Sequence, residues 1–266
     1  MPFTLAHPAA VVPLCQRLHH PELASALVIG SMAPDFVYWV PLPIYRDMSH
    51  TIPGLLTFCL PAGFMVFCLY HLLIKRPLLA LLPRAIFVRL PAPSPIPWRL
   101  RHIVLVLLAV LFGATTHIAW DAFTHSDTLM TRLLPFLETP LFTRSGYILR
   151  VYKVLQHIST LVGCGVLALF GWRWYQRTPP REDIGGEGLA TWRKAALVAW
   201  LVVPSVIGAI RSGLHRAPGE VSLGALQKFL TSGVVTGIGI FSIALVTLGL
   251  LWPLVQRRER VNADAG

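Results

Sequence analysis

Residues 102–123 read HIVLVLLAVLFGATTHIAWDAF, an apolar run that contains only three ionisable residues. As an α-helix this run would be about 33 Å long at 1.5 Å per residue, which matches the hydrocarbon core of a bilayer. Arg99 and Arg101 precede it, and basic residues typically flank membrane-spanning helices. We therefore predict that residues 102–123 cross a membrane.

Four more apolar stretches have the length that a spanning helix needs, near residues 54–74, 148–172, 194–214 and 231–255. The composition agrees, because only 13% of the residues are charged, against roughly 25% in soluble domains. The predicted fold class is all-α, a polytopic transmembrane helical bundle. We expect residues 1–266 to form a single integral membrane domain.

Residues 1–53 are apolar but broken by prolines, among them Pro8, Pro13 and Pro34. Proline removes a backbone donor and ends or bends a helix, and irregular backbone at membrane depth needs protein or trapped water to satisfy it. The segment therefore predicts an N-terminal helical hairpin or a re-entrant segment, with a sixth span at 22–41 as the alternative. No basic segment follows Met1, so we expect no cleaved signal peptide.

The 23 Lys and Arg residues outnumber the 12 Asp and Glu residues, and they gather at the ends of apolar runs. Their concentration in the connections 75–101 and 173–194 and in the C-terminal tail predicts that these parts are cytoplasmic. The expected location is the cell (inner or plasma) membrane, with lipids as partners. Nucleic-acid binding is not expected, since that needs basic residues interleaved with exposed aromatic or polar ones.

The four cysteines show no CxxC spacing, which argues against a disulfide framework or a thiolate zinc site. Serine nucleophile, phosphate-loop and dinucleotide motifs are also absent from the sequence. Any catalytic or binding site is therefore expected among the ionisable residues inside the apolar segments. Ionisable side chains are energetically unfavourable in a membrane and usually face the protein interior or a water-filled cavity.

His117, Asp121 and His125 follow one another at intervals of four residues, so on a helix they lie along one stripe. Imidazole nitrogen and carboxylate oxygen suit zinc, and the mixed set also suits manganese or iron. The alternative for this motif is a simple His–Asp hydrogen bond on one helix.

Four further ionisable residues are candidates for the same site. Asp35 follows Gly-Ser-Met-Ala-Pro within an apolar run and needs a partner or a metal to stay charged, although it could instead cap a helix N-terminus. His50 could be a surface residue and His7 an interfacial one. His157 lies well inside its predicted span, where it either supports a metal site from behind or makes a hydrogen bond between helices.

The order of these motifs resembles the bacterial membrane protein family DUF4184: His7, then GSMAPD at 30–35, then Ser49-His50, then HxxxD at 117–121. More distantly, the pattern is similar to the YdjM-type membrane-bound hydrolases that are thought to depend on metal, and to zinc-dependent phospholipase C. The first resemblance covers most of the chain and the second about its first half. The resemblance implies a divalent metal bound by His7, Asp35, His50, His117 and Asp121. It does not place His125 or His157, and the full ligand set of the soluble phospholipases is not found here.

The leading hypothesis is a membrane-embedded metal-dependent hydrolase that acts on a phosphoester or a lipid headgroup at the non-cytoplasmic interface. Asp35 and Asp121 are the candidate catalytic residues, either of which could serve as a general base. The alternatives are ion or proton handling, or transport, by the same buried groups, and a structural or assembly role in which the histidines only hold helices together.

Overall fold

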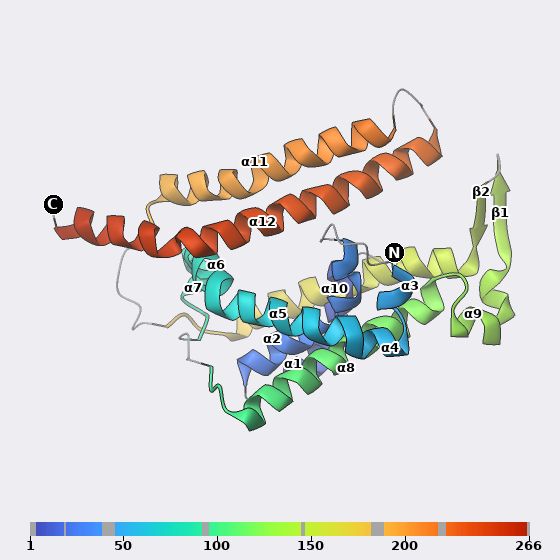
Figure 1. Cartoon of the computed structure of the whole chain (residues 1–266), viewed down its shortest axis with the longest axis horizontal. Coiled ribbons are helices and arrows are strands. Elements are labelled where there is room, and N and C mark those ends of the chain that lie inside the picture. The colour runs from blue at the N-terminus through green and yellow to red at the C-terminus, as the bar shows by residue number, and fades with distance from the viewer. Residues whose placement is uncertain are drawn as a thin grey trace. The chain divides into compact units, whose positions relative to one another are not determined.

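The computed structural model describes residues 4–18, 20–38, 46–91, 96–144, 147–181, 189–217 and 222–264, most of them in helices (Figure 1). Within this part of the chain, five helical stretches are long and apolar enough to cross a membrane: Ile52–Leu81, Leu100–Thr124, Val151–Arg177, Thr191–Arg216 and Gly224–Gln256. Each overlaps one of the predicted spans. The prediction of a polytopic helical membrane protein is confirmed.

The residue contacts divide the chain into two compact units. The first comprises Met1–Val37, Leu42–Phe67 and Ala92–Pro179, and the second comprises Tyr38–Pro41, Cys68–Pro91 and Pro180–Gly266. A single integral domain over residues 1–266 stays a prediction. The candidate site residues named above all belong to the first unit.

The N-terminal region of the first unit consists of short helices, as its prolines predict. They are the 3-10 helix η1 (Thr4–Ala10), α1 (Val12–Cys15), α2 (Pro21–Gly30) and the 3-10 helix η2 (Ala33–Tyr38). The alternative of a sixth span at 22–41 is wrong for the described residues up to Tyr38, because α2 ends at Gly30 and η2 is a separate helix. Residues 39–41 of that span lie outside the described part.

The first spanning stretch is preceded by α3 (Arg46–Ser49) and changes its winding along its length. It runs through α4 (Ile52–Gly54), the π-helical η3 (Leu55–Cys59), α5 (Leu60–Leu69), the π-helical η4 (Tyr70–Ile74) and α6 (Lys75–Leu81), and α7 (Arg84–Phe87) follows. Its residues up to Phe67 belong to the first unit and those from Cys68 onward to the second. Two long helices lie entirely in the first unit, α8 (Leu100–Thr124) and α10 (Val151–Arg177).

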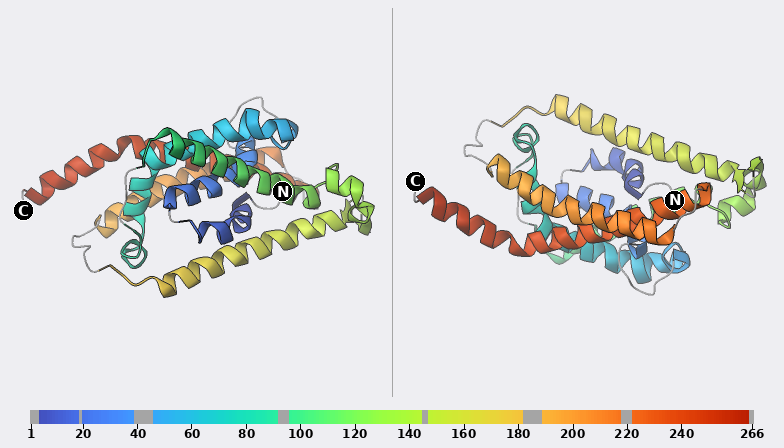
Figure 2. Two further views of the ribbon diagram at one scale, coloured as in Figure 1. Left: turned by 90° about the horizontal axis from the view of Figure 1, so that it is seen from below. Right: turned by 90° about the horizontal axis from the view of Figure 1, so that it is seen from above.

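Helix α2 packs against α8 with their backbones in direct contact, because each contributes a glycine at the crossing. A Cβ atom at Gly30 would overlap the carbonyl oxygen of Val110, and one at Gly113 would overlap the carbonyl oxygen of Leu27. The N-terminal helices, coloured blue, lie between α8 and α10 in the left view of Figure 2. This packing brings the N-terminal polar residues close to the C-terminal half of α8.

The connection from α8 to α10 is folded. It contains α9 (Leu129–Leu133), the 3-10 helix η5 (Pro135–Glu138) and an antiparallel hairpin of β1 (Pro140–Arg144) and β2 (Tyr147–Arg150). Strand β2 occupies residues 148–150, with which the third predicted span began, so α10 starts at Val151. The hairpin was not predicted.

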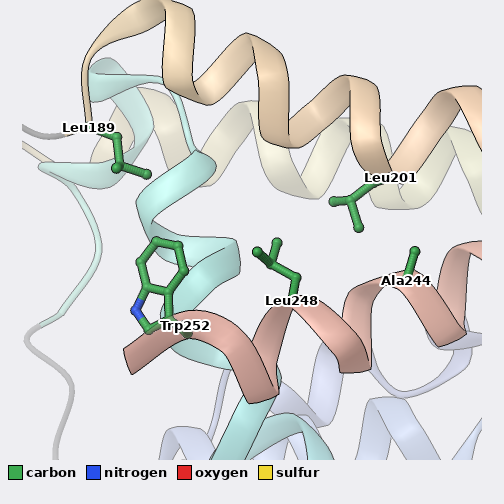
Figure 3. Packing of buried hydrophobic residues seen from close by; sticks show 5 residues of the cluster. All are labelled: Leu189, Leu201, Ala244, Leu248 and Trp252. Atoms are coloured by element: carbon green, nitrogen blue, oxygen red, sulfur yellow. The ribbon is translucent and has the colours of Figure 1, made fainter. Parts of the chain in front are cut away.

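In the second unit, α11 (Thr191–Arg216) and α12 (Leu223–Asp264) lie side by side and run in opposite directions (Figure 1). The buried apolar cluster of this unit consists of Leu189, Leu201, Ala244, Leu248 and Trp252, and Figure 3 shows them from close by.

Candidate metal centre

Five side chains converge in the first unit, and they come from four separate segments. η1 provides His7, η2 provides Asp35, His50 directly follows α3, and α8 provides His117 and Asp121. His7, Asp35, His117 and Asp121 are at most 3% exposed, and the side chain of His50 is 9% exposed. The structure therefore brings together all five residues that the resemblance implied as ligands.

Four ligand atoms of this cluster face one another. His50 Nε2 lies 3.5 Å from both Asp35 Oδ1 and Asp121 Oδ2. His117 Nε2 lies 3.8 Å from Asp35 Oδ1 and 3.6 Å from Asp121 Oδ2. These separations exceed the usual 2.7–3.2 Å of an N–H···O hydrogen bond.

Three of the four separations, 3.5, 3.5 and 3.6 Å, fit ligands that share one cation, and the fourth, 3.8 Å, is slightly longer. Zinc bonds of 2.0–2.2 Å to nitrogen and oxygen, arranged tetrahedrally, place neighbouring ligand atoms about 3.3–3.6 Å apart. Among the described residues, His117 Nε2 and Asp35 Oδ1 are buried and have no hydrogen-bond partner. Asp35, His50 and His117 thus form a group that could hold a metal ion.

His7, His117 and Asp121 form a second such group. The His7 and His117 rings stack with their centroids 3.6 Å apart. His7 Nε2 lies 3.6 Å from Asp121 Oδ1, which is the carboxylate oxygen that faces away from His50. Asp121 therefore presents one oxygen to each group.

Hydrogen bonds behind the cluster orient its side chains. The Nδ1–H group of His117 donates to the Ser31 carbonyl oxygen at 2.7 Å, which leaves a lone pair on Nε2. The Thr4 hydroxyl group donates to Asp35 Oδ2 at 2.6 Å, and the Ser49 hydroxyl oxygen lies 2.9 Å from His50 Nδ1. Such partners fix the tautomer and direction of metal ligands in known metal sites.

The charges of the cluster suit a divalent cation. Burial, followed by the nearby His117, lowers the pKa of His7 to about 3, so His7 is neutral at pH 7 and its nitrogen can bind a cation. Burial raises the pKa of Asp35, but the nearby His50 and His117 imidazoles and the hydrogen bond from the Thr4 hydroxyl group together lower it below its ordinary value. Two buried carboxylates need positive charge, and a divalent cation would supply it.

The two remaining predicted residues differ in position. His125 follows α8 and lies beside the cluster, with Nδ1 3.5 Å from Asp121 Oδ1 and Nε2 3.4 Å from Gln156 Nε2. Among the described residues, it belongs to neither of the two groups that could hold a metal ion. His157 is exposed, whereas the neighbouring Gln156 is only 1% exposed.

Sequence reasoning missed the residues that support the cluster, namely Thr4, Ser31, Ser49 and Gln156. The signal for Gln156 was present, because an amide inside an apolar span needs a polar partner just as a histidine does. Ser31 and Ser49 lie within two of the motifs that carry the resemblance, GSMAPD and Ser49-His50, but the resemblance gave them no role, and Thr4 lies in none of these motifs.

Residues 1–250 match the family model described as domain of unknown function (DUF4184). No curated protein and no solved structure matches the chain.

Proposed function

The chain belongs to the DUF4184 family, and we propose that it is a membrane-embedded metal-dependent hydrolase. The observation that carries the proposal is the convergence of two buried carboxylates and three buried or nearly buried imidazoles from four segments of the chain. Burying these polar side chains in an apolar protein is energetically unfavourable unless a bound cation offsets the free energy of their desolvation.

We favour zinc as the cation, with manganese or iron as alternatives. The donors are imidazole nitrogen and carboxylate oxygen, which suit all three. His7, Asp35, His50, His117 and Asp121 would hold it. When bound, a divalent cation lowers the pKa of a water molecule and polarises a phosphoryl or carbonyl oxygen.

The two aspartates would orient the cation and move a proton. Asp35 keeps its Oδ2 engaged by Thr4, so its Oδ1 is the atom that faces the cluster. Asp121 lies between the cluster and His125, with Oδ1 3.5 Å from His125 Nδ1. Asp121 would accept the proton from an attacking water molecule, and His125, whose Nδ1 also lies 3.3 Å from the Asp121 carbonyl oxygen, would orient this carboxylate through its Nδ1–H group.

The proposed substrate is a phosphoester or a lipid headgroup at the non-cytoplasmic interface. Asp121 lies three residues before the end of α8, and the opposite end of that helix follows the basic connection 75–101. If that connection is cytoplasmic, the cluster lies near the other face of the cell membrane and the C-terminus is cytoplasmic. Headgroups of membrane lipids lie at that depth.

The test is hydrolysis of a phospholipid by the full chain in proteoliposomes. We expect turnover that a chelator abolishes and added zinc restores. Asp35→Asn and Asp121→Asn should each reduce it at least about 100-fold, while the control His157→Ala leaves it unchanged. Hydrolysis that is indifferent to chelator, or a metal-loaded protein that hydrolyses neither phosphoester nor carboxyl ester, would contradict the proposal.

A further inference from the structure

A polar cavity of about 370 Å³ lies in the folded connection between α8 and α10. It is formed by the residues that follow α8, by α9, by η5 and by the junction of β2 with α10. This volume is at the lower end of the range for small-molecule sites. Its lining includes Ser126, Asp127, Arg132, Glu138, Arg150 and Tyr152.

The cavity adjoins the candidate metal centre. Ser126 directly follows His125. Tyr152 lies one helical turn before Gln156 on the same face of α10. His125 in turn lies beside both Gln156 and Asp121, with its Nε2 3.4 Å from Gln156 Nε2 and its Nδ1 3.5 Å from Asp121 Oδ1. A molecule in the cavity would therefore lie next to the metal centre.

The cavity carries charges of both signs, with two guanidinium groups from Arg132 and Arg150 and two carboxylates from Asp127 and Glu138. Arg150 Nη1 donates a hydrogen bond to the Glu138 carbonyl oxygen at 2.6 Å and lies 3.7 Å from Glu138 Oε2. A guanidinium group has five N–H donors, so this bond fixes Arg150 and leaves donors for a second acceptor. A zwitterionic ligand can pair with both signs of charge, whereas a purely anionic one is repelled by the two carboxylates.

The same connection carries exposed apolar side chains. Leu129 and Leu133 of α9, Phe136 of η5, and Leu141 and Phe142 of β1 are each 54–64% exposed. So many exposed apolar side chains in one short segment indicate contact with a membrane or another protein. The connection joins two spanning helices, and in Figure 1 α9 and the hairpin lie together beyond the start of α10. The bilayer that these helices cross is therefore the nearest apolar phase, which places the cavity at the depth of the lipid headgroups.

We propose that this cavity binds the headgroup of a zwitterionic phospholipid. The phosphate group pairs with Arg132 and Arg150, because guanidinium groups bind phosphate oxygens through charge-assisted hydrogen bonds. The ammonium group pairs with the carboxylates of Asp127 and Glu138, and the acyl chains lie against the exposed apolar residues of the connection. The inference rests on the proposed function, because it names the lipid that the adjacent metal centre would hydrolyse.

The test is a binding titration that involves no turnover. Dihexanoylphosphatidylethanolamine, a short-chain lipid that stays dissolved, is titrated by calorimetry into the full chain in an uncharged detergent. A chelator is present, so that no metal-dependent reaction consumes the lipid. We expect saturable binding of one molecule per chain. Dihexanoylphosphatidylglycerol, which lacks the ammonium group, and phosphoethanolamine, which lacks the acyl chains, should each bind at least about tenfold more weakly.

Arg132→Gln should weaken binding of the phosphatidylethanolamine at least about tenfold, the effect of losing one charge-assisted hydrogen bond. Arg132 is exposed in the last turn of α9, so its replacement leaves no gap in the core. Arg216→Gln is the matched control, because Arg216 is exposed in the last turn of α11, and it should leave the affinity unchanged.

Asp127→Asn tests the pairing with the ammonium group. The backbone of Asp127 has a φ of 58°, which asparagine also tolerates. The variant should therefore keep its local structure and lose the preference for phosphatidylethanolamine over phosphatidylglycerol.

The proposal is overturned if the phosphatidylethanolamine does not bind saturably, if Arg132→Gln binds it as tightly as Arg216→Gln, or if the phosphatidylglycerol binds equally well. Equal affinity for phosphoethanolamine would overturn the assignment to a lipid in favour of a soluble phosphate compound. Each of these results leaves the metal centre unaffected, and a failed hydrolysis assay leaves the outcome of this titration unaffected.

Discussion

The hydroxyl group of Thr4 lies 2.6 Å from Asp35 Oδ2 and supports the side chains of the proposed metal centre from behind. Thr4→Val keeps the shape of the side chain but removes this hydrogen bond. We expect the affinity for divalent metal to fall about 10–100-fold, the usual effect of losing such a partner. Competition with a chelator of known affinity measures it. Thr57→Val is the matched control, because Thr57 is exposed and bonds only its own helix; an equal loss in both variants would contradict the assignment.

Gln156 and His157 are neighbours in sequence, but only Gln156 is buried. Gln156→Ala removes an amide group beside His125 and leaves a gap, so we expect a loss of about 1–3 kcal/mol in unfolding free energy. His157→Ala should change it by less than about 0.5 kcal/mol. Thermal unfolding in detergent compares the two. A larger loss of unfolding free energy for His157→Ala than for Gln156→Ala would show that the buried face of α10 is the one that carries His157.

Gln156 and His157 also show how far the position of a single side chain could be predicted from the sequence. Asp35, His117 and Asp121 could be named because an ionisable group in an apolar run needs a partner wherever it points. The choice between Gln156 and His157 could not be made, because adjacent residues on a helix differ by about 100° in direction. That choice depends on which face of α10 meets η1, a contact between distant parts of the chain.

Among the elements, the crossing of α2 and α8 depends most on a single position. A Cβ atom at Gly113 would meet backbone atoms of Leu27, Gly30 and Ser31, which cannot move independently. We expect Gly113→Ala to destabilise the protein by about 1–3 kcal/mol, despite the better helix propensity of alanine. Because Ser31 holds His117, metal affinity should fall as well.

The control for this prediction is Gly165→Ala in α10, where a Cβ atom would have nothing within 4 Å. It should leave stability unchanged or raise it by up to about 1 kcal/mol. Thermal unfolding and metal competition on both variants check the prediction. Equal stability and equal metal affinity of Gly113→Ala and Gly165→Ala would mean that the backbones of α2 and α8 are not in contact.

The elements differ in how far they could be predicted. Length and apolarity fixed the five spans, and the prolines predicted that the N-terminal region is broken. The hairpin of β1 and β2 was missed because its eleven-residue stretch, 140–150, runs directly into the apolar α10, so that residues 148–150 resemble the start of a spanning helix. The placing of η1 and η2 beside α8 could not be predicted, since it depends on packing between segments far apart in sequence.

For the whole molecule, the distribution of basic residues predicts which connections share a side of the membrane. In a variant without its native cysteines, Ser126→Cys should react with a membrane-impermeant maleimide on intact cells. Thr178→Cys should react only after the cells are permeabilised. The reverse pattern would place the proposed metal centre at the cytoplasmic face and would remove the argument for a substrate on the outer side.

The central claim is that His7, Asp35, His50, His117 and Asp121 bind a divalent cation, and elemental analysis of the purified full chain tests it most directly. The account predicts at least one equivalent of divalent metal per chain, with zinc foremost, and the loss of at least one equivalent in folded Asp35→Asn/Asp121→Asn protein. A wild-type protein that is folded, free of metal and unchanged in thermal stability when zinc is added would contradict it.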